Sequence, residues 1–162
     1  MQPNLRPIQK SDDSPLAKLI KTVLTEFKAN KPGTAYFDES TNHLSAVFDN
    51  PKAAYWVVEE NGQIIGGGGI FPTAGLPDET CELVKLYLYP EARGKGLGKA
   101  IMDKCFEKAL ELGYKNIYLE SMPELNQAVS MYEKMGFVRQ CSALGNSGHF
   151  GCDIWMVKKL LQ

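Results

Sequence analysis

The chain has 162 residues, 44% hydrophobic and 23% charged, and its 18 Lys and Arg against 19 Asp and Glu leave a net charge of −1. These values are typical of one globular domain and exclude an intrinsically disordered chain, so we expect residues 1–162 to form a single domain. A charge near zero argues against a broad nucleic-acid surface or a polybasic membrane patch. No apolar run approaches the roughly 20 residues that span a bilayer, and the first residues lack the apolar region of a signal peptide.

The cysteines and histidines indicate the cellular compartment of the protein and whether it binds a metal. The four cysteines form no CxxC pair, and the chain has only two histidines, His43 and His149. A zinc site therefore has few ligands to draw on, and we expect no metal site. Cysteines without a disulfide pattern are typical of a reducing compartment, so we expect a cytoplasmic protein with free thiols.

The first third of the chain predicts one strand and two helices. Residues 4–8 are expected as an edge strand, because they include a proline that removes one ladder donor. Ser14 and Pro15 suit the N-cap and the first position of a helix that continues at helical spacing to about Lys28. A weaker apolar pattern predicts a second helix over residues 38–48.

A β-hairpin is expected next. Residues 54–60 and 63–71 are strand-like runs on either side of Asn61-Gly62, a strong hairpin turn signal. The second run contains four consecutive glycines at positions 66–69. Such a run marks a bulge or the close approach of another segment or a ligand.

The second half alternates strands with helices, which indicates an α/β or α+β domain. Strands are expected over residues 81–89, 116–120, 137–141 and 152–159, and a polar, glycine-rich loop over 142–151. One amphipathic helix is expected over residues 99–112. Another is expected from a capping box at Ser121 and Glu124 to Met135.

The segment Arg-Gly-Lys-Gly-Leu-Gly-Lys at 93–99 lies between a strand and a helix. Glycines let successive backbone N–H groups converge on an anion, and a helix N-terminus adds unpaired donors. Arg93, Lys95 and Lys99 add positive charge, so the segment suits a diphosphate. It fits neither the P-loop nor the Rossmann pattern, and a plain chain reversal is the alternative.

Residues 93–98, Arg-Gly-Lys-Gly-Leu-Gly, resemble the Q/R-x-x-G-x-G/A signature of the GNAT family of N-acetyltransferases. Residues 132–137, Tyr-Glu-Lys-Met-Gly-Phe, are similar to the family's Y-E-x-x-G-F ending, and the order of elements agrees over nearly the whole chain. The resemblance implies a mixed, twisted sheet of six to seven strands with about four helices, splayed between the strands at 81–89 and 116–120. It also implies an enzyme that moves the acetyl group of acetyl-CoA to an amine of a small molecule or peptide, by direct attack in a ternary complex.

The resemblance places the pantetheine arm of acetyl-CoA in the splay. Backbone groups of Leu86, Tyr87 and Leu88 would pair with its amides, and Arg93 would anchor the turn or flank the phosphates. The pyrophosphate would be wrapped by the residues of the turn, namely Gly94, Lys95, Gly96, Leu97, Gly98 and Lys99.

A CoA-binding asparagine of many family members falls on Leu125 in this chain, one residue before Asn126. We expect Asn126 to contact CoA in its place, although a shift of one residue along a helix rotates a side chain by about 100°.

Two residues are candidates for proton transfer, which amine acetylation requires. Glu82 lies eleven residues before Arg93, at the position of the general base in the histone-acetylating branch of the family. Alternatively it binds a cationic acceptor, and water or Glu120 takes the proton. Tyr132 matches the family's general acid toward the CoA sulfur. Its alternative is a core residue that packs on Val129.

Glu120 and His149 are the expected acceptor contacts, since Glu120 ends a strand at the splay and His149 lies in the loop at 142–151. An exposed loop histidine is the alternative for His149. A non-catalytic CoA-sensing or protein-binding module on the same fold is the competing function, because a fold alone does not fix an activity. A nucleotide-binding protein is a third candidate function. A homodimer is a candidate assembly, because closed homodimers are common among soluble proteins.

Overall fold

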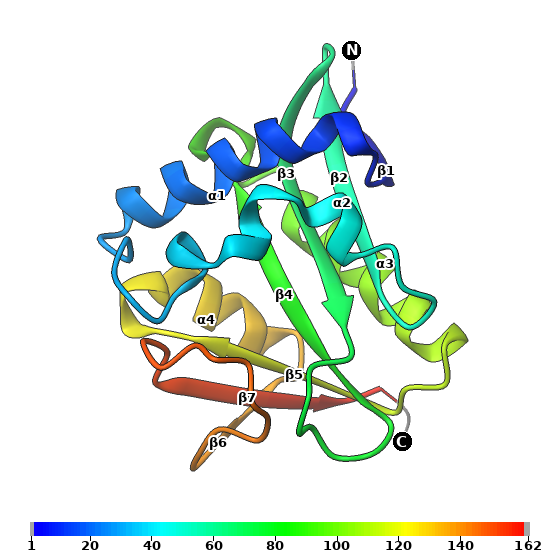
Figure 1. Cartoon of the computed structure of the whole chain (residues 1–162), viewed down its shortest axis with the longest axis vertical. Helices are drawn as coiled ribbons and strands as arrows, with labels where there is room; N and C mark the ends of the chain where they lie inside the picture. Colours follow the sequence, from blue (N-terminus) through cyan, green and yellow to red (C-terminus); the bar gives the residue numbers. More distant parts are fainter. Residues whose placement is uncertain (1, 161–162) are drawn as a thin grey trace.

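The computed structural model describes residues 2–160 (Figure 1). Its strands form one seven-stranded sheet in the order β1-β2-β3-β4-β5-β7-β6. The strands are β1 (Asn4–Pro7), β2 (Ala54–Glu60), β3 (Gln63–Phe71), β4 (Thr80–Leu88), β5 (Asn116–Ser121), β6 (Val138–Gln140) and β7 (Ile154–Lys159). The α-helices are α1 (Asp13–Glu26), α2 (Leu44–Val47), α3 (Leu97–Glu111) and α4 (Asn126–Lys134). The expected fold class, with its mixed sheet and four helices, is confirmed.

The core consists of two buried clusters, one on each face of the sheet. One contains the apolar residues of α1 and α2 and the other those of α3 and α4. Strand β2 contributes to both, because successive side chains of a strand point to opposite faces. Val57 packs with α1, and its neighbour Val58 packs with α3. The helices therefore hold the sheet from both sides (Figure 1).

The β2–β3 hairpin forms as predicted. Asn61 has φ 53° and Gly62 has φ 77°, so both turn residues adopt the left-handed conformation of the expected hairpin turn. The glycine run in β3 allows close approach, as expected. A Cβ at Gly67 would lie 2.7 Å from the ring of Tyr55, and one at Gly68 would lie 2.8 Å from the side chain of Leu86.

Strand β4 contains a β-bulge. Two of its residues, Lys85 and Leu86, lie opposite the single residue Gly68 of β3. Lys85 has φ 52°, and the hydroxyl of Tyr55 donates a hydrogen bond to its carbonyl oxygen at 2.7 Å. Bulges bend a strand and redirect its side chains. This one lies just beyond the last residue that β4 pairs with β5.

The splay between β4 and β5 is confirmed. The two strands pair in parallel only over residues 80–82 and 116–118. Beyond Glu82 and Tyr118 each strand continues without pairing the other, and they diverge in Figure 1. The backbone edges of β4 and β5 that face each other there are thus available to pair with an extended, chain-like group.

The prediction of a helix over residues 38–48 is wrong. That segment forms a 3₁₀ turn at Glu39–Asn42 and the four-residue helix α2. Polar side chains there bind backbone and neighbouring groups instead of leaving the chain free to form a long helix. The hydroxyl of Thr41 donates to the carbonyl of Ala35 at 2.7 Å, and Ser45 donates to the carboxylate of Asp13.

Two expected helix starts are also wrong. Ser14 lies inside α1, because a 3₁₀ turn at Lys10–Asp12 begins the helical geometry earlier. Ser121 caps no helix, because it pairs with Ile154 as the last residue of β5. A 3₁₀ turn then precedes α4, which begins at Asn126.

No helix within residues 2–160 is both long and apolar enough to cross a membrane. All four cysteines lie in this described part of the chain and are free thiols, as expected.

Candidate active site

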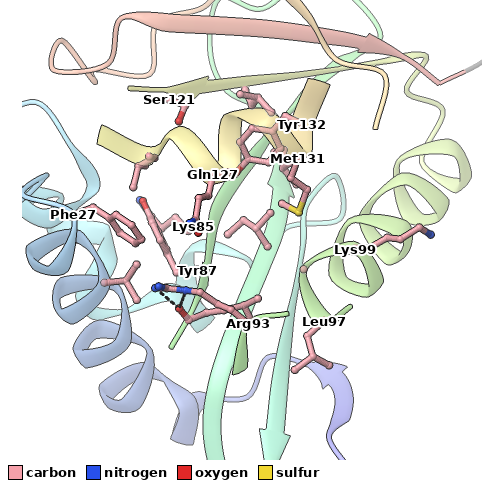
Figure 2. Close-up of a pocket in the computed structure, with 18 of the residues that line it drawn as sticks. Phe27, Lys85, Tyr87, Arg93, Leu97, Lys99, Ser121, Gln127, Met131 and Tyr132 are labelled. Atoms are coloured by element: carbon pink, nitrogen blue, oxygen red, sulfur yellow. Dashed lines mark hydrogen bonds between the residues drawn. The ribbon is translucent and has the colours of Figure 1, made fainter. Parts of the chain in front are cut away.

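A cavity of about 390 Å³ occupies the splay (Figure 2). Its walls come from β4 and its bulge, the end of β5, the glycine-rich turn with the start of α3, helix α4, and helix α1 with the residue that follows it. The residues that line it include Leu83, Lys85, Leu86, Tyr87, Leu88, Arg93, Gly94, Gly96, Leu97, Gly98, Lys99, Leu119, Glu120, Ser121, Gln127, Met131 and Tyr132. Most of the expected cofactor contacts therefore meet in one place.

The glycine-rich turn presents its backbone to one end of this cavity. Gly94 has φ 75° and Gly96 has φ 78°, and Gly96 is the N-cap of α3. The two lysines of the turn have exposed side chains. Lys95 is not among the lining residues. Lys99 is a lining residue, but its ammonium points away from the cavity in Figure 2 and pairs with Asp103 at 2.8 Å. The backbone N–H groups of the turn and the dipole of α3 are further features that suit an anion.

Arg93 anchors the turn. Its guanidinium donates to the carbonyl of Leu88 at 2.9 and 3.1 Å, as dashed lines show in Figure 2. It also pairs with Glu26 at 2.7 Å and lies over the ring of Phe27. These contacts use the guanidinium and occupy the carbonyl of Leu88, which fixes the end of β4 relative to α1. Of the two roles expected for Arg93, the structure shows the anchoring one.

Helix α4 presents Tyr132 to the cavity. Its ring packs against Phe137 with centroids 5.8 Å apart, and burial raises the pKa of the phenol. Val129 belongs to the same buried cluster. Tyr132 therefore packs in the core and also lines the cavity, where Figure 2 shows it.

Asn126 lies elsewhere. Leu125 and Gln127 line the cavity, whereas Asn126 lines a separate depression with Glu133 and Arg139. The one-residue offset noted in the sequence turns its side chain away from the splay.

Ser121 is a cavity residue that the sequence did not indicate. Its hydroxyl is buried and has no hydrogen-bond partner within the described chain, although it lines the cavity. A buried polar group without a partner is uncommon and costs stability unless a ligand or water satisfies it. No local sequence signal could have revealed this, because the missing partner is a property of the assembled sheet.

Glu82 is a buried carboxylate at the last β4–β5 pair. Only 3% of the residue is exposed, and Oε1 accepts a hydrogen bond from the hydroxyl of Thr73 at 2.6 Å. Burial raises its pKa to about 7, and the nearby Glu120 carboxylate adds to the shift. A carboxylate with a pKa near neutrality is suited to exchange protons with an amine. Thr73 was not foreseen from the sequence.

Glu120 and His149 meet beside this carboxylate. Glu120 accepts hydrogen bonds from the hydroxyls of Tyr118, at 2.6 Å, and Ser147. Nδ1 of His149 lies 3.9 Å from Glu120. Only 17% of the His149 side chain is exposed, so it is not the exposed loop histidine of the alternative.

Asp38 completes this group, although the sequence pattern predicted a helix for its segment and no role in a site. Its Oδ2 lies 2.5 Å from Nε2 of His149 and 2.9 Å from the ammonium of Lys85. Burial alone would raise the pKa of Asp38, but His149 and Lys85 outweigh burial and hold it at about 2. Asp38 therefore joins the loop before β7 to the bulge of β4.

The acetyltransferase (GNAT) family matches residues 18–137 of this chain. The chain belongs to the GNAT family of acetyltransferases. This places it among the acyltransferase enzymes and confirms the resemblance found in the glycine-rich turn and in the Y-E-x-x-G-F ending.

Individual relatives agree. The chain is 39% identical over 160 residues to a protein of Escherichia coli called "Uncharacterized N-acetyltransferase YjgM", covering 98% of this chain and 95% of that one. A GNAT-family acetyltransferase from Staphylococcus aureus has a TM-score of 0.88 at 18% identity, over 99% of this chain and all of that one. The structure of yncA from Salmonella typhimurium with its cofactor acetyl-CoA has a TM-score of 0.77 at 17% identity, over 100% and 96% of the two chains.

Proposed function

We propose that this GNAT enzyme transfers the acetyl group of acetyl-CoA to the amine of a small molecule or peptide, by direct attack in a ternary complex. The observation that carries the proposal is the cavity in the splay, which is lined at once by the glycine-rich turn, by Tyr132 and by Glu120. One bound molecule of acetyl-CoA could thus place its diphosphate at the turn and its thioester near the carboxylates. The acetyl-CoA complex of yncA, a relative in fold, supports this choice of donor.

The donor is bound mainly by backbone groups. The N–H groups of the turn from Gly94 to Lys99 and the N-terminus of α3 hold the pyrophosphate. The edge of β4 that β5 leaves unpaired, at Leu86 and Tyr87, pairs with the pantetheine amides. The unpartnered hydroxyl of Ser121 offers a further hydrogen bond from the opposite strand.

The chemistry needs two proton transfers. The amine nitrogen attacks the thioester carbon, the C–S bond breaks, and CoA leaves as a thiolate. Glu82 takes the proton of the amine, directly or through water, and Tyr132 donates a proton or a strong hydrogen bond to the departing sulfur. No covalent intermediate with the protein is required.

The acceptor is proposed to be a cationic amine. The acceptor end of the site holds three carboxylates, those of Glu82, Glu120 and Asp38, beside the ammonium of Lys85 and the imidazole of His149. Carboxylates attract an ammonium group and can then remove its proton. Glu120 and His149 are the proposed acceptor contacts.

The proposal is tested with the full chain, acetyl-CoA and a panel of small amines and peptides, with release of free CoA thiol as the readout. Thiol release that depends on one class of amine is the expected result. If acetyl-CoA raises the melting temperature but no amine releases thiol above the rate of hydrolysis, the chain is a CoA-sensing module. If ATP competes with acetyl-CoA for stabilisation, a nucleotide is the better ligand.

Gly96→Val is expected to abolish the rise in melting temperature that acetyl-CoA produces. Gly96 has φ 78°, and no protein atom lies within 4 Å of a Cβ built there. The substitution therefore meets backbone strain but no protein clash, and its side chain fills space assigned to a phosphate oxygen.

Gly113→Val is the matched control, because Gly113 follows the other end of α3 with φ 90° and the same open space. It shares the strain but should keep the response to acetyl-CoA. Equal acetyl-CoA binding by the two variants would show that the diphosphate lies elsewhere.

Ser121→Ala should weaken acetyl-CoA binding about 2- to 10-fold, the range expected for one hydrogen bond. The melting temperature of the free protein should not fall, because the hydroxyl has no protein partner to lose. Calorimetric titration with acetyl-CoA measures the first effect. Ser130→Ala, at an exposed position of α4 outside the cavity, is the control. Unchanged affinity in Ser121→Ala would leave the hydroxyl without a role in donor binding.

A further inference from the structure

Three metal-ligating side chains meet beside the cavity. The carboxylate of Glu120, the imidazole of His149 and the thiol of Cys152 place one ligand atom each within 4.8 Å of one another. They come from the end of β5, the loop after β6 and the residue pair before β7. The backbone N–H of Asp153 donates to the carbonyl of Ser121 at 3.1 Å, which holds the Cys152 segment against the end of β5.

Two of the three side chains are oriented by outer partners. The Nε2 atom of His149 is engaged by Asp38 at 2.5 Å, so Nδ1 is the nitrogen that faces Glu120. The Oε2 atom of Glu120 accepts from the hydroxyl of Tyr118 at 2.6 Å, and Oε1, which also accepts from the hydroxyl of Ser147, is the oxygen that faces His149. A carboxylate on the far nitrogen of a histidine, and a hydrogen bond on the far oxygen of a carboxylate, are the usual second layer of a metal site.

We propose that Glu120, His149 and Cys152 form a zinc-binding site. Nitrogen, oxygen and sulfur donors together are a set that Zn²⁺ accepts, whereas Mg²⁺ and Ca²⁺ require oxygen donors. Zinc–ligand bonds of about 2.0–2.3 Å bring ligand atoms to roughly 3.3–3.7 Å from one another. The three donors, now within 4.8 Å of one another, therefore need to close by about 1 Å to hold the ion.

Three protein ligands leave a fourth zinc position open. With the ion bound, Glu120 and His149 would hold the metal instead of contacting the acceptor directly. Because Glu120 lines the cavity, the ion would lie at its edge. The expectation of no metal site came from counting histidines. One histidine suffices here, because the fold adds a cysteine three residues along the chain and a glutamate from a distant strand.

The binding test uses the full-length chain and Zn²⁺ alone, titrated by calorimetry, with Co²⁺ as a spectroscopic probe. One equivalent of Zn²⁺ is expected to bind. Co²⁺ should produce the near-ultraviolet charge-transfer band of a cobalt–thiolate bond. Cys152→Ser should lose the band, whereas Cys141→Ser, at an exposed cysteine outside the group, should retain it.

Two further variants and a control separate a site from adventitious binding. Asp38→Asn should weaken Zn²⁺ binding about 10- to 100-fold, the effect expected for an outer partner of a ligating histidine. His149→Gln should abolish stoichiometric binding, and His43→Gln should leave it intact. The proposal is overturned if the parent binds no Zn²⁺, or if Cys152→Ser keeps the cobalt–thiolate band. Neither outcome depends on acetyl transfer.

Discussion

Tyr132→Phe is expected to lower kcat by roughly 10²–10⁴-fold, the usual contribution of a positioned acid. The phenylalanine ring keeps the contact with Phe137 but removes the hydroxyl that we propose as the donor to the departing thiolate. The loss should fall on kcat and kcat/KM together, because the hydrogen bond forms mainly in the transition state. Steady-state kinetics with acetyl-CoA and a working amine measure it.

Tyr114→Phe is the control for Tyr132→Phe. Tyr114 is also buried, but its hydroxyl donates to the carbonyl of Lys52 at 2.8 Å, and it does not line the cavity. Its removal should lower stability by about 1 kcal/mol and leave the rate unchanged. The opposite pattern, in which Tyr132→Phe unfolds easily but keeps its turnover, would make Tyr132 a packing residue.

Glu82→Gln is expected to lower kcat by roughly 10²–10⁴-fold, with acetyl-CoA affinity retained. The pKa of Glu82 is raised to about 7, so the parent rate should rise with pH up to that value as the carboxylate becomes a base. The variant should lose this inflection and be impaired most at low pH, where few amine molecules are neutral. Glu107→Gln, at an exposed position of α3, should keep the parent profile.

The same substitution should stabilise the folded chain at alkaline pH. The folded protein holds the Glu82 proton more tightly than the unfolded chain does, so stability falls as pH rises from the ordinary glutamate value to about 7. Glutamine has no charge to bury, and Glu82→Gln should melt at a higher temperature than the parent at pH 8. A higher melting temperature with an unchanged pH–rate profile would transfer the role of base to Glu120 or to water.

The parts of the fold that sequence predicted are those governed by local rules. Asn61-Gly62 predicted the hairpin turn because both residues tolerate positive φ, which that turn requires. The glycine run in β3 predicted close approach, and apolar spacing predicted α1 and α3 to within a few residues. These signals depend only on neighbours in the chain, so no knowledge of distant contacts was needed.

The sequence prediction failed where distant contacts decide the conformation. Residues 38–48 have a weak helical pattern, yet Asp13 and Ala35 bind their polar groups and turn the chain into short pieces. Ser121 satisfies a capping pattern, but pairing with β7 keeps it in a strand. In both cases the local preference is small, and a long-range partner overrides it.

In the candidate site, too, local motifs were predictable from sequence and long-range contacts were not. By itself the sequence determined the family, a turn suited to a diphosphate and the candidates Glu82 and Tyr132, because each belongs to a motif of fixed spacing. Only the tertiary structure brought Asp38, Thr73 and Cys152 to the acceptor end, left Ser121 without a partner and turned Asn126 away. The physical reason is that burial, unpaired hydrogen-bond groups and raised pKa values arise where segments far apart in the chain meet, and spacing along the chain does not encode those meetings.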